Sequence, residues 1–433
     1  MKHTDIIQKL NLEQKCALLS GETVFTTRAL PGKGIPAITL SDGPNGVRKQ
    51  AGAADHLGLN PSVPATCFPT SSATACSWDE KLGEAVGEAL GEEAAAQEVA
   101  VLLGPGLNIQ RSPLCGRDFE YFSEDPILAG RMAAAYVRGI QKNGISACPK
   151  HFAVNSQELR RMASDSVLDE RTLRELYLTG FEIVVKEAKP KTIMTSYNLI
   201  NGTYANENAH LLQDILRKDW GFDGAVVTDW GGSNDHALGV KNGSTLEMPC
   251  PGGDSIRELM KAVQDGKISE ADVDARLDEM LELVFSTHAA VEKAPRTFDA
   301  AAHHKLARRA AAESIVLLRN EGGILPLKPN EKLAVIGDFA ETPRYQGAGS
   351  SAVNALQVDT LLDCIKADDS GITLVGYASG FERQGAADAE KLEEAVALAK
   401  KADTVLLCLG LDELRESEGL DRADMKLAEN QQQ

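Results

Sequence analysis

The sequence predicts an α/β fold in which a TIM-barrel-like (β/α) domain is followed by a smaller, partial α/β sandwich domain. Short apolar segments alternate with longer amphipathic ones over residues 1–290. Strands that alternate with helices form parallel sheets covered by helices, and this many units predict a closed or nearly closed barrel. The alternation restarts after a polar, alanine-rich stretch at 288–313, which indicates a second unit.

The strands of the first unit are expected where short apolar or β-branched runs end in turn residues. Helical patterns lie between them, and the pattern at 169–188 opens with Asp169, a residue type favoured at the N-cap. Asp125 and Pro126 form a similar N-cap and first-turn pair. The expected strands are 35–40, 99–104, 144–148, 192–197, 224–228 and 244–249, and the expected helices are 79–97, 169–188 and 207–220.

The second unit repeats the alternation as an open sheet. We expect domains at 1–290 and 313–433, joined by a linker at 291–312. His303 and His304 fall in this linker without partners at ligand spacing, so they are interpreted as solvated rather than as metal ligands. The expected strands are 332–338, 371–377 and 403–410, with a helix at 388–402.

Composition excludes several classes of function. Acidic residues outnumber basic ones, 63 to 45, and the formal charge of −18 disfavours nucleic acid and anionic membranes as partners. No apolar run reaches membrane-spanning length, and the N-terminus lacks the apolar core of a secretory signal. The eight cysteines, including Cys250, form no Cys-x-x-Cys pair and indicate free thiols in a reducing compartment. We therefore expect a cytoplasmic protein with a neutral small-molecule substrate and no metal or cofactor; a homo-oligomer stays open.

One carboxylate stands at the end of an apolar strand. Asp229 follows the run 224–228 and precedes Trp230 and two glycines, which would hold the acid rigidly at the lip of a cleft. Such a carboxylate can act as a nucleophile, a general base or a metal ligand. It can equally do no more than cap the next helix, and this segment alone does not decide between these uses.

Other ionisable and aromatic side chains also follow predicted strands. Because the carboxyl ends of parallel strands share one rim of a barrel, these side chains are expected to converge there. A ring of donors and acceptors suits a neutral polyhydroxylated ligand. A phosphate ligand is the rival, but the chain has no Gly-x-x-x-x-Gly-Lys-[Ser/Thr] loop, and interleaved acids would repel an anion. The members of this ring are Asp42, Arg48, Arg117, Lys150, His151 and Arg161.

Together these motifs resemble glycoside hydrolase family 3, most closely its β-glucosidases. The similarity extends over nearly the whole chain, and the block 104–232 is the most specific part. The motifs that carry it include "SDGPNGVR" (41–48), "GPGLNIQRSPLCGRDFEYFSEDP" (104–126), "KHFAVNSQELRRM" (150–162), "GFDGAVVTDWGG" (221–232), "QGAGSSAVN" (346–354) and "ESEGLDR" (416–422).

The resemblance implies a retaining β-glucosidase that removes terminal non-reducing β-D-glucosyl residues through a covalent glycosyl-enzyme. Asp229 matches the nucleophile, and Glu418 matches the general acid/base, with Glu416 as the less favoured alternative. Neighbouring Arg and Lys residues should keep Asp229 ionised, whereas Glu418 must be protonated in the first step. The sugar-binding residues implied by the resemblance are Asp42, Arg48, Arg117, Lys150, His151, Arg161, Tyr197, Trp230 and Ser350.

Two alternatives stay open. A β-xylosidase of the same family could use the same ring, since the ring can hold a pentose. The chain also stops at "ADMKLAENQQQ", soon after Glu418, whereas family β-glucosidases continue further. We therefore expect a fragment with an uncovered sheet edge and apolar faces, in which the loop carrying Glu418 is not firmly held. A non-catalytic sugar-binding fragment is the alternative outside enzymology.

Overall fold

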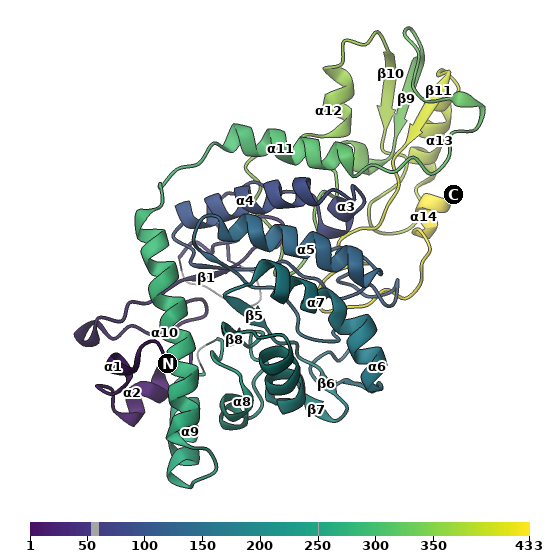
Figure 1. The fold of residues 1–433 in the computed structure, drawn as a ribbon. Coiled ribbons are helices and arrows are strands. Elements are labelled where there is room, and N and C mark those ends of the chain that lie inside the picture. The colour runs from purple at the N-terminus through teal and green to yellow at the C-terminus, as the bar shows by residue number, and fades with distance from the viewer. Residues whose placement is uncertain (53–59, 250) are drawn as a thin grey trace.

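The protein folds into two α/β units connected by a long helix (Figure 1). A computed structural model describes residues 1–52, 60–249 and 251–433. Cys250 lies outside the described residues, and the other seven cysteines are free thiols. Within the described ranges, none of the helices combines the length and apolarity that crossing a bilayer requires.

The first unit is a barrel of short parallel strands. Three of them form one sheet in the order β1–β2–β3, and β5 pairs with β8. All of them are fully buried, as expected for strands that line the interior of a barrel. The strands are β1 (Leu40–Asp42), β2 (Val101–Leu103), β3 (Ser146–Ala147), β5 (Thr192–Met194) and β8 (Ala225–Val227).

Isolated backbone bridges close the ring between these sheets. Parallel bridges join Phe152 to Thr195, Val227 to Leu246 and Glu247 to Ser20, and an antiparallel bridge joins Thr26 to Thr39. The predicted closed barrel is therefore confirmed. The strand predicted at 244–249 is reduced to the two bridging residues Leu246 and Glu247. The strand predicted at 35–40 begins only at Leu40, and residues of the N-terminal segment form isolated antiparallel bridges with Ile35 and Thr39 before it.

Helices cover the barrel, and two of them pack through glycines. A Cβ on Gly87 of α4 would lie 2.4 Å from the Tyr136 carbonyl oxygen of α5, and one on Gly139 would lie 2.2 Å from that of Glu84. The predicted N-caps are confirmed, since Asp125 and Asp169 both accept backbone N–H bonds. The helices are α1 (Thr4–Ile7), α2 (Leu12–Ala17), α3 (Ser71–Ala75), α4 (Glu80–Ala96), α5 (Pro126–Gln141), α6 (Glu170–Thr172), α7 (Thr179–Ile183), α8 (His236–Asn242), α9 (Asp254–Gln264) and α10 (Glu270–Lys293), with π-helical turns at η2 (Leu173–Leu178), η3 (Val184–Ala188) and η5 (His210–Asp219).

The connecting helix α11 (Ala300–Glu313) contacts both units. His303 is buried, and its Nδ1 lies 2.7 Å from Oε1 of Glu93 in the barrel unit. His304 Nε2 lies 2.9 Å from Oδ2 of Asp359 in the second unit. The interpretation of both histidines as solvated was therefore wrong for His303, because a buried carboxylate across the interface compensates the burial of the imidazole.

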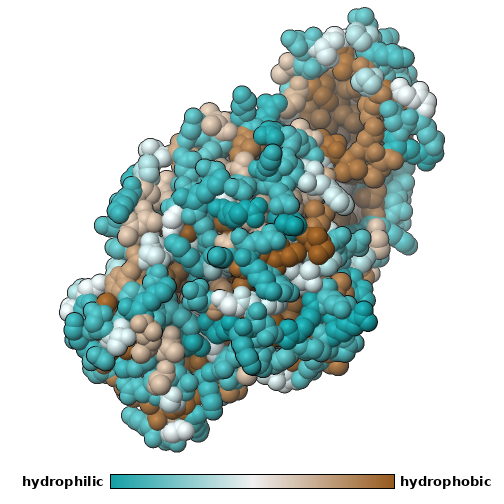
Figure 2. Space-filling model, viewed as in Figure 1, coloured by the Kyte–Doolittle hydropathy of each residue, from teal (hydrophilic) through white to brown (hydrophobic). Residues whose placement is uncertain are grey.

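The second unit is a small parallel sheet in the order β10–β9–β11. Among the described residues β11 pairs with β9 alone and forms an edge of the sheet, and Val405 and Leu407 on it are 40% and 56% exposed. Figure 2 shows apolar surface gathered on this unit, as the sequence predicts. The elements of the second unit are β9 (Lys332–Ile336), α12 (Leu361–Lys366), β10 (Thr373–Ala378), α13 (Ala389–Ala399), β11 (Thr404–Leu407) and α14 (Glu429–Gln432).

The barrel unit also has a small side sheet, which contains β4 (Asp165–Ser166), β6 (Leu199–Ile200) and β7 (Thr203–Tyr204).

The His303–Glu93 contact predicts a pH-dependent stability. Burial lowers the pKa of His303, but the hydrogen bond and the charges of Glu93 and Glu92 raise it above its ordinary value. The stabilisation is therefore present below about pH 6.5 and is lost as pH rises through the folded pKa. We expect His303→Ala to lower the free energy of unfolding by about 3 kcal/mol near pH 6 and by less near pH 9, measured by urea denaturation.

His304→Ala is the matched control on the same helix. Its ion pair with Asp359 is partly exposed, so its loss should cost about 1 kcal/mol or less. An equal loss for His303→Ala at both pH values would contradict a charged pair.

Candidate active site

Asp229 lies at the carboxyl-terminal rim of the barrel strands. This residue follows β8, and its Oδ1 accepts a hydrogen bond from the Trp230 backbone N–H at 2.8 Å. Its Oδ2 is buried and accepts no hydrogen bond from the described residues, although His151 Nε2 lies 3.6 Å away. A buried carboxylate oxygen without a donor is costly, and a catalytic role is one of the explanations for such an atom.

A buried set of cations lies beside Asp229. Arg117 donates two hydrogen bonds to Glu120, of 2.7 and 3.0 Å, and both side chains are fully buried. Lys150 Nζ lies 3.4 Å from Glu120 Oε1 and 4.0 Å from Asp42 Oδ1. Sequence analysis missed Glu120, although its position three residues after Arg117 in "GRDFE" is the signal of a local ion pair.

His151 is held in one orientation. Its Nδ1 lies 3.1 Å from the Tyr121 hydroxyl, which accepts a hydrogen bond from Asn155 Nδ2. The Tyr121 proton is therefore free to be donated to Nδ1, which leaves the ring proton on Nε2, facing Asp229. Burial and the charges of Arg117 and Lys150 lower the pKa of His151 well below its ordinary value, so the imidazole is neutral.

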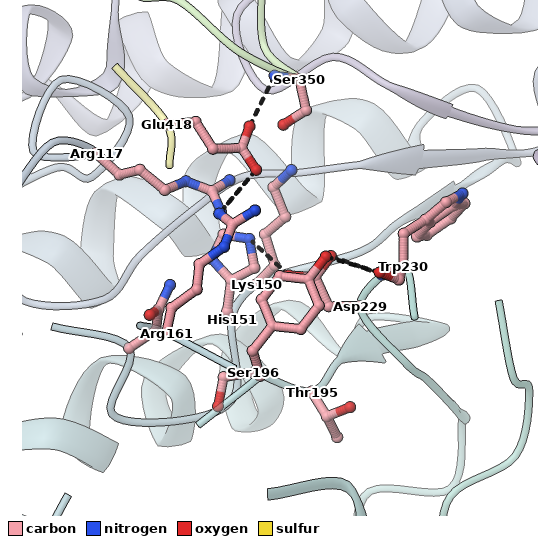
Figure 3. Close-up of polar contacts among 12 residues, drawn as sticks. Arg117, Lys150, His151, Arg161, Thr195, Ser196, Asp229, Trp230, Ser350 and Glu418 are labelled. Carbon is pink, nitrogen blue, oxygen red and sulfur yellow. Dashed lines mark hydrogen bonds and ion pairs between the residues drawn. The ribbon is translucent and has the colours of Figure 1, made fainter. Parts of the chain in front are cut away.

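Glu418 reaches this set from the second unit (Figure 3). Its Oε1 lies 2.9 Å from Arg161 Nη1 and 3.5 Å from Arg117 Nη1, while its Oε2 accepts the Ser350 N–H at 2.7 Å. Glu416, two residues earlier, pairs instead with Arg344 of its own unit at 2.9 Å. Of the two predicted acids, only Glu418 contacts the barrel residues that surround Asp229.

The remaining predicted residues lie around the same space. The Tyr197 hydroxyl donates to the Trp230 carbonyl oxygen at 2.9 Å, and the guanidinium of Arg161 lies 4.7 Å above the Tyr197 ring. Arg48 is buried, and its backbone N–H donates to the Asp42 carbonyl oxygen at 2.9 Å. Trp230 is fixed by a 2.7 Å bond from Nε1 to the Val24 carbonyl oxygen.

The pKa values of the two acids are shifted in directions that differ from the expectation. Burial raises the pKa of Asp229 despite the nearby Arg117, Arg161 and Lys150, so the cations do not hold that pKa low. Burial opposes ionisation of Glu418 too, but Arg117, Arg161 and the Ser350 donor outweigh it and hold its pKa far below the ordinary range. The expected order is reversed because Glu418 receives direct donors, whereas Asp229 Oδ2 receives none.

The third acid of the site is also shifted. Burial, together with the charges of Glu418 and Asp229, raises the pKa of Asp42 to about 6, although Lys150 and Arg48 lower it. Among the described residues, no group of acidic, histidine or cysteine side chains is arranged to hold a metal ion. The arrangement offers two carboxyls on different units, a neutral imidazole and several cations, which suits acid–base chemistry on a hydroxyl-rich neutral molecule.

Comparison with known protein families shows the family to which the chain belongs. Residues 53–283 match the glycosyl hydrolase family 3 N terminal domain, and residues 315–433 match the glycosyl hydrolase family 3 C-terminal domain. The chain belongs to glycosyl hydrolase family 3. Its fold is that of the family, and the sequence-based prediction of this family is confirmed. The boundaries 1–290 and 313–433 stay predictions.

Individual family members resemble the chain closely. The thermostable β-glucosidase B of Acetivibrio thermocellus is 46% identical over 98% of this chain and 56% of the relative. An exo-α-(1→6)-L-arabinopyranosidase of Bifidobacterium longum is 44% identical over 98% of this chain and 57% of the relative. The crystal structure of a family 3 β-glucosidase from Bifidobacterium adolescentis superposes with a TM-score of 0.91 at 42% identity, covering 98% of this chain and 60% of that one. The chain therefore spans little more than half the length of these relatives.

Proposed function

We propose that the chain carries the catalytic residues of a retaining β-glucosidase acting on terminal non-reducing β-D-glucosyl residues. The observation that carries the proposal is the buried carboxylate of Asp229 after β8, whose charge interacts with Arg117 and Arg161 and with Glu418, the acid that the other unit places on these same arginines. In this proposal Asp229 attacks the anomeric carbon and forms a glycosyl ester, while Glu418 gives a proton to the departing oxygen. Glu418 then takes a proton from water, whose oxygen replaces Asp229 with net retention.

The proposed sugar pocket is the buried polar set around Asp229. A glucosyl unit has hydroxyls on every side, and unpaired buried polar groups are costly, so complementary donors and acceptors give selectivity. Lys150 and Arg117 supply donors, Asp42 supplies an acceptor, and Trp230 supplies a flat apolar surface. Arg48, His151, Arg161, Tyr197 and Ser350 complete the set that we propose to bind the sugar.

A second candidate comes from the 44% identical relative that is an L-arabinopyranosidase. Its sugar is a pentopyranose without a hydroxymethyl group, as is xylose, so a pentosidase would use the same polar ring with a smaller pocket. Rates on matched aryl β-glucoside, β-xyloside and α-L-arabinopyranoside substrates separate these candidates. Binding of sugar without turnover of any of them would support a non-catalytic fragment instead.

The setting of the protein is also a proposal. The formal charge of −18 and the free thiols support a cytoplasmic enzyme that meets small glycosides rather than nucleic acid or membranes. A homo-oligomer is compatible with these properties, and size-exclusion chromatography with light scattering would determine the state of association.

Mechanism-based labelling tests the role of Asp229. After incubation with 2-deoxy-2-fluoro-β-glucosyl fluoride, we expect one added fluoroglucosyl group, located by mass spectrometry on the peptide that contains Asp229. The fluorine at C2 slows both the formation and the breakdown of the ester, whereas the fluoride leaving group speeds its formation, so the intermediate accumulates. Asp229→Ala should not be labelled; a label on another acid would remove Asp229 as the nucleophile.

Paired variants test the acid/base. Glu418→Ala should lower kcat/KM for alkyl glucosides about 100-fold or more, and far less for dinitrophenyl glucoside, whose leaving group needs no proton. Azide should restore turnover by forming glucosyl azide. Glu416→Ala is the matched control and should behave almost as wild type; azide rescue of that variant instead would move the acid/base by two positions.

The raised pKa of Asp229 predicts a shifted pH profile. In Glu418→Gln assayed on dinitrophenyl glucoside, the acid/base no longer titrates, burial still raises the pKa of Asp229, and Asp229 must be ionised to attack. Because its pKa is raised, kcat/KM should fall as pH drops through a value above the ordinary one of about 4 and should reach a plateau at higher pH. A midpoint at or below about 4 would contradict the raised pKa.

A further inference from the structure

The turn that carries Glu418 is fastened to the barrel by a carboxylate that the proposed reaction does not use. Asp421 Oδ1 accepts backbone N–H bonds from Gly116 at 3.1 Å and Glu158 at 2.9 Å. Its Oδ2 accepts from Glu158 at 3.1 Å and Leu159 at 2.9 Å. Gly116 lies in the loop after β2, and the other two lie in the loop after β3, so one side chain ties two barrel loops to the second unit.

Backbone N–H groups of the second unit also donate hydrogen bonds to the barrel loops. The Gly419 N–H donates to Glu158 Oε2 at 2.8 Å, and the Arg422 N–H donates to the Leu114 carbonyl oxygen at 2.7 Å. The surfaces also fit closely, because a Cβ on Gly116 would lie 1.7 Å from the Leu420 carbonyl oxygen. The turn therefore rests directly on the backbone of the barrel loop, where no side chain could be accommodated.

Glu418 is held on its other side by the glycine-rich turn of its own unit. Its N–H donates to the Ala348 carbonyl oxygen at 3.1 Å, and a Cβ on Gly349 would lie 2.4 Å from the Cβ of Glu418. Arg161 Nη1 connects the two attachments, since it donates both to Glu158 Oε2 at 2.7 Å and to Glu418 Oε1 at 2.9 Å. The carboxyl group of Glu418 is thus fixed between two loops of the barrel and one of the second unit.

We propose that Asp421 is a positioning residue for the acid/base, which sets the reach of Glu418 into the barrel site. The inference rests on the proposed function, because it concerns the proton transfer assigned there to Glu418. Proton transfer requires hydrogen-bond reach, and a displacement of about 1 Å can cost about 100-fold in rate. Asp229 follows β8, and the contacts of the described residues include no hydrogen bond or ion pair between Asp229 and Asp421. Its attack on an activated substrate therefore depends on this attachment less than proton transfer by Glu418 does.

Leaving-group dependence tests the proposal in the full chain. Asp421→Ala should lower kcat/KM for alkyl glucosides about 100-fold, and kcat/KM for dinitrophenyl glucoside less than about 10-fold. Azide should restore part of the turnover of dinitrophenyl glucoside. Asp421→Asn, which keeps the shape but replaces one acceptor oxygen by a donor, should show the same pattern with smaller losses. Equal losses on both substrates, or none, would overturn the positioning role, since a merely structural role lowers all rates together.

Hydrogen–deuterium exchange provides a readout that does not need activity. Asp421→Ala should accelerate exchange in peptides containing 116, 158–159 and 418–419, and leave the strands of the barrel interior unchanged. Asp424→Ala is the matched control, because in the described part of the chain Asp424 accepts a hydrogen bond from the Lys426 N–H of its own segment and none from the barrel loops. It should change neither exchange nor kinetics. Unchanged exchange in Asp421→Ala would overturn the attachment itself.

If wild-type enzyme neither hydrolyses any aryl glycoside nor is labelled at Asp229, the proposed function fails, and the positioning role fails with it.

Discussion

The buried ion pair between Arg117 and Glu120 is the contact on which both halves of the site depend. Burying either charge alone would cost much desolvation free energy, but the two hydrogen bonds from Arg117 to Glu120 compensate for it. They leave Arg117 Nη1 directed toward Glu418. Lys150 shares the same carboxylate and extends the positive surface toward Asp42. The barrel therefore presents rigid cations at its rim, and the second unit contributes the acid that binds them.

Charge balance in the pocket explains why its three acids behave differently. Asp42, Asp229 and Glu418 share one set of cations, and mutual repulsion raises the pKa of Asp42 and Asp229 beyond the effect of burial. Glu418 alone receives a cationic donor and a backbone donor directly, so it retains its charge. A sugar hydroxyl that engaged Arg161 or Arg117 would weaken those bonds, and the proton would then move toward Glu418, where the proposed first step requires it.

The two units contact each other at several separated places. One is the turn 417–420 with Asp421, which makes polar contacts with barrel loops, and another is the parallel bridge between Ala65 and Ala355. A further one is α11, whose adjacent histidines face opposite units. Together they fix the second unit against the barrel rim, and the prediction that the Glu418 loop would be poorly held is not borne out by this packing. Every residue proposed for the reaction lies within a chain that spans little more than half of its family relatives.

Local signals in the sequence determined the strands, the N-caps at Asp125 and Asp169, and the family, because periodicity, caps and motifs depend on neighbouring residues. They also named the polar residues that gather at the rim, since the ends of parallel strands must meet there. Three features depended on the tertiary structure. Glu120 binds Lys150, which lies 30 residues away in the sequence, and Asp421 accepts hydrogen bonds from backbone N–H groups, which no side-chain pattern reveals. The burial of His303 depends on a carboxylate distant in sequence. The reversed pKa order of Asp229 and Glu418 depends on which oxygen receives a donor, and that is decided only when the two units dock.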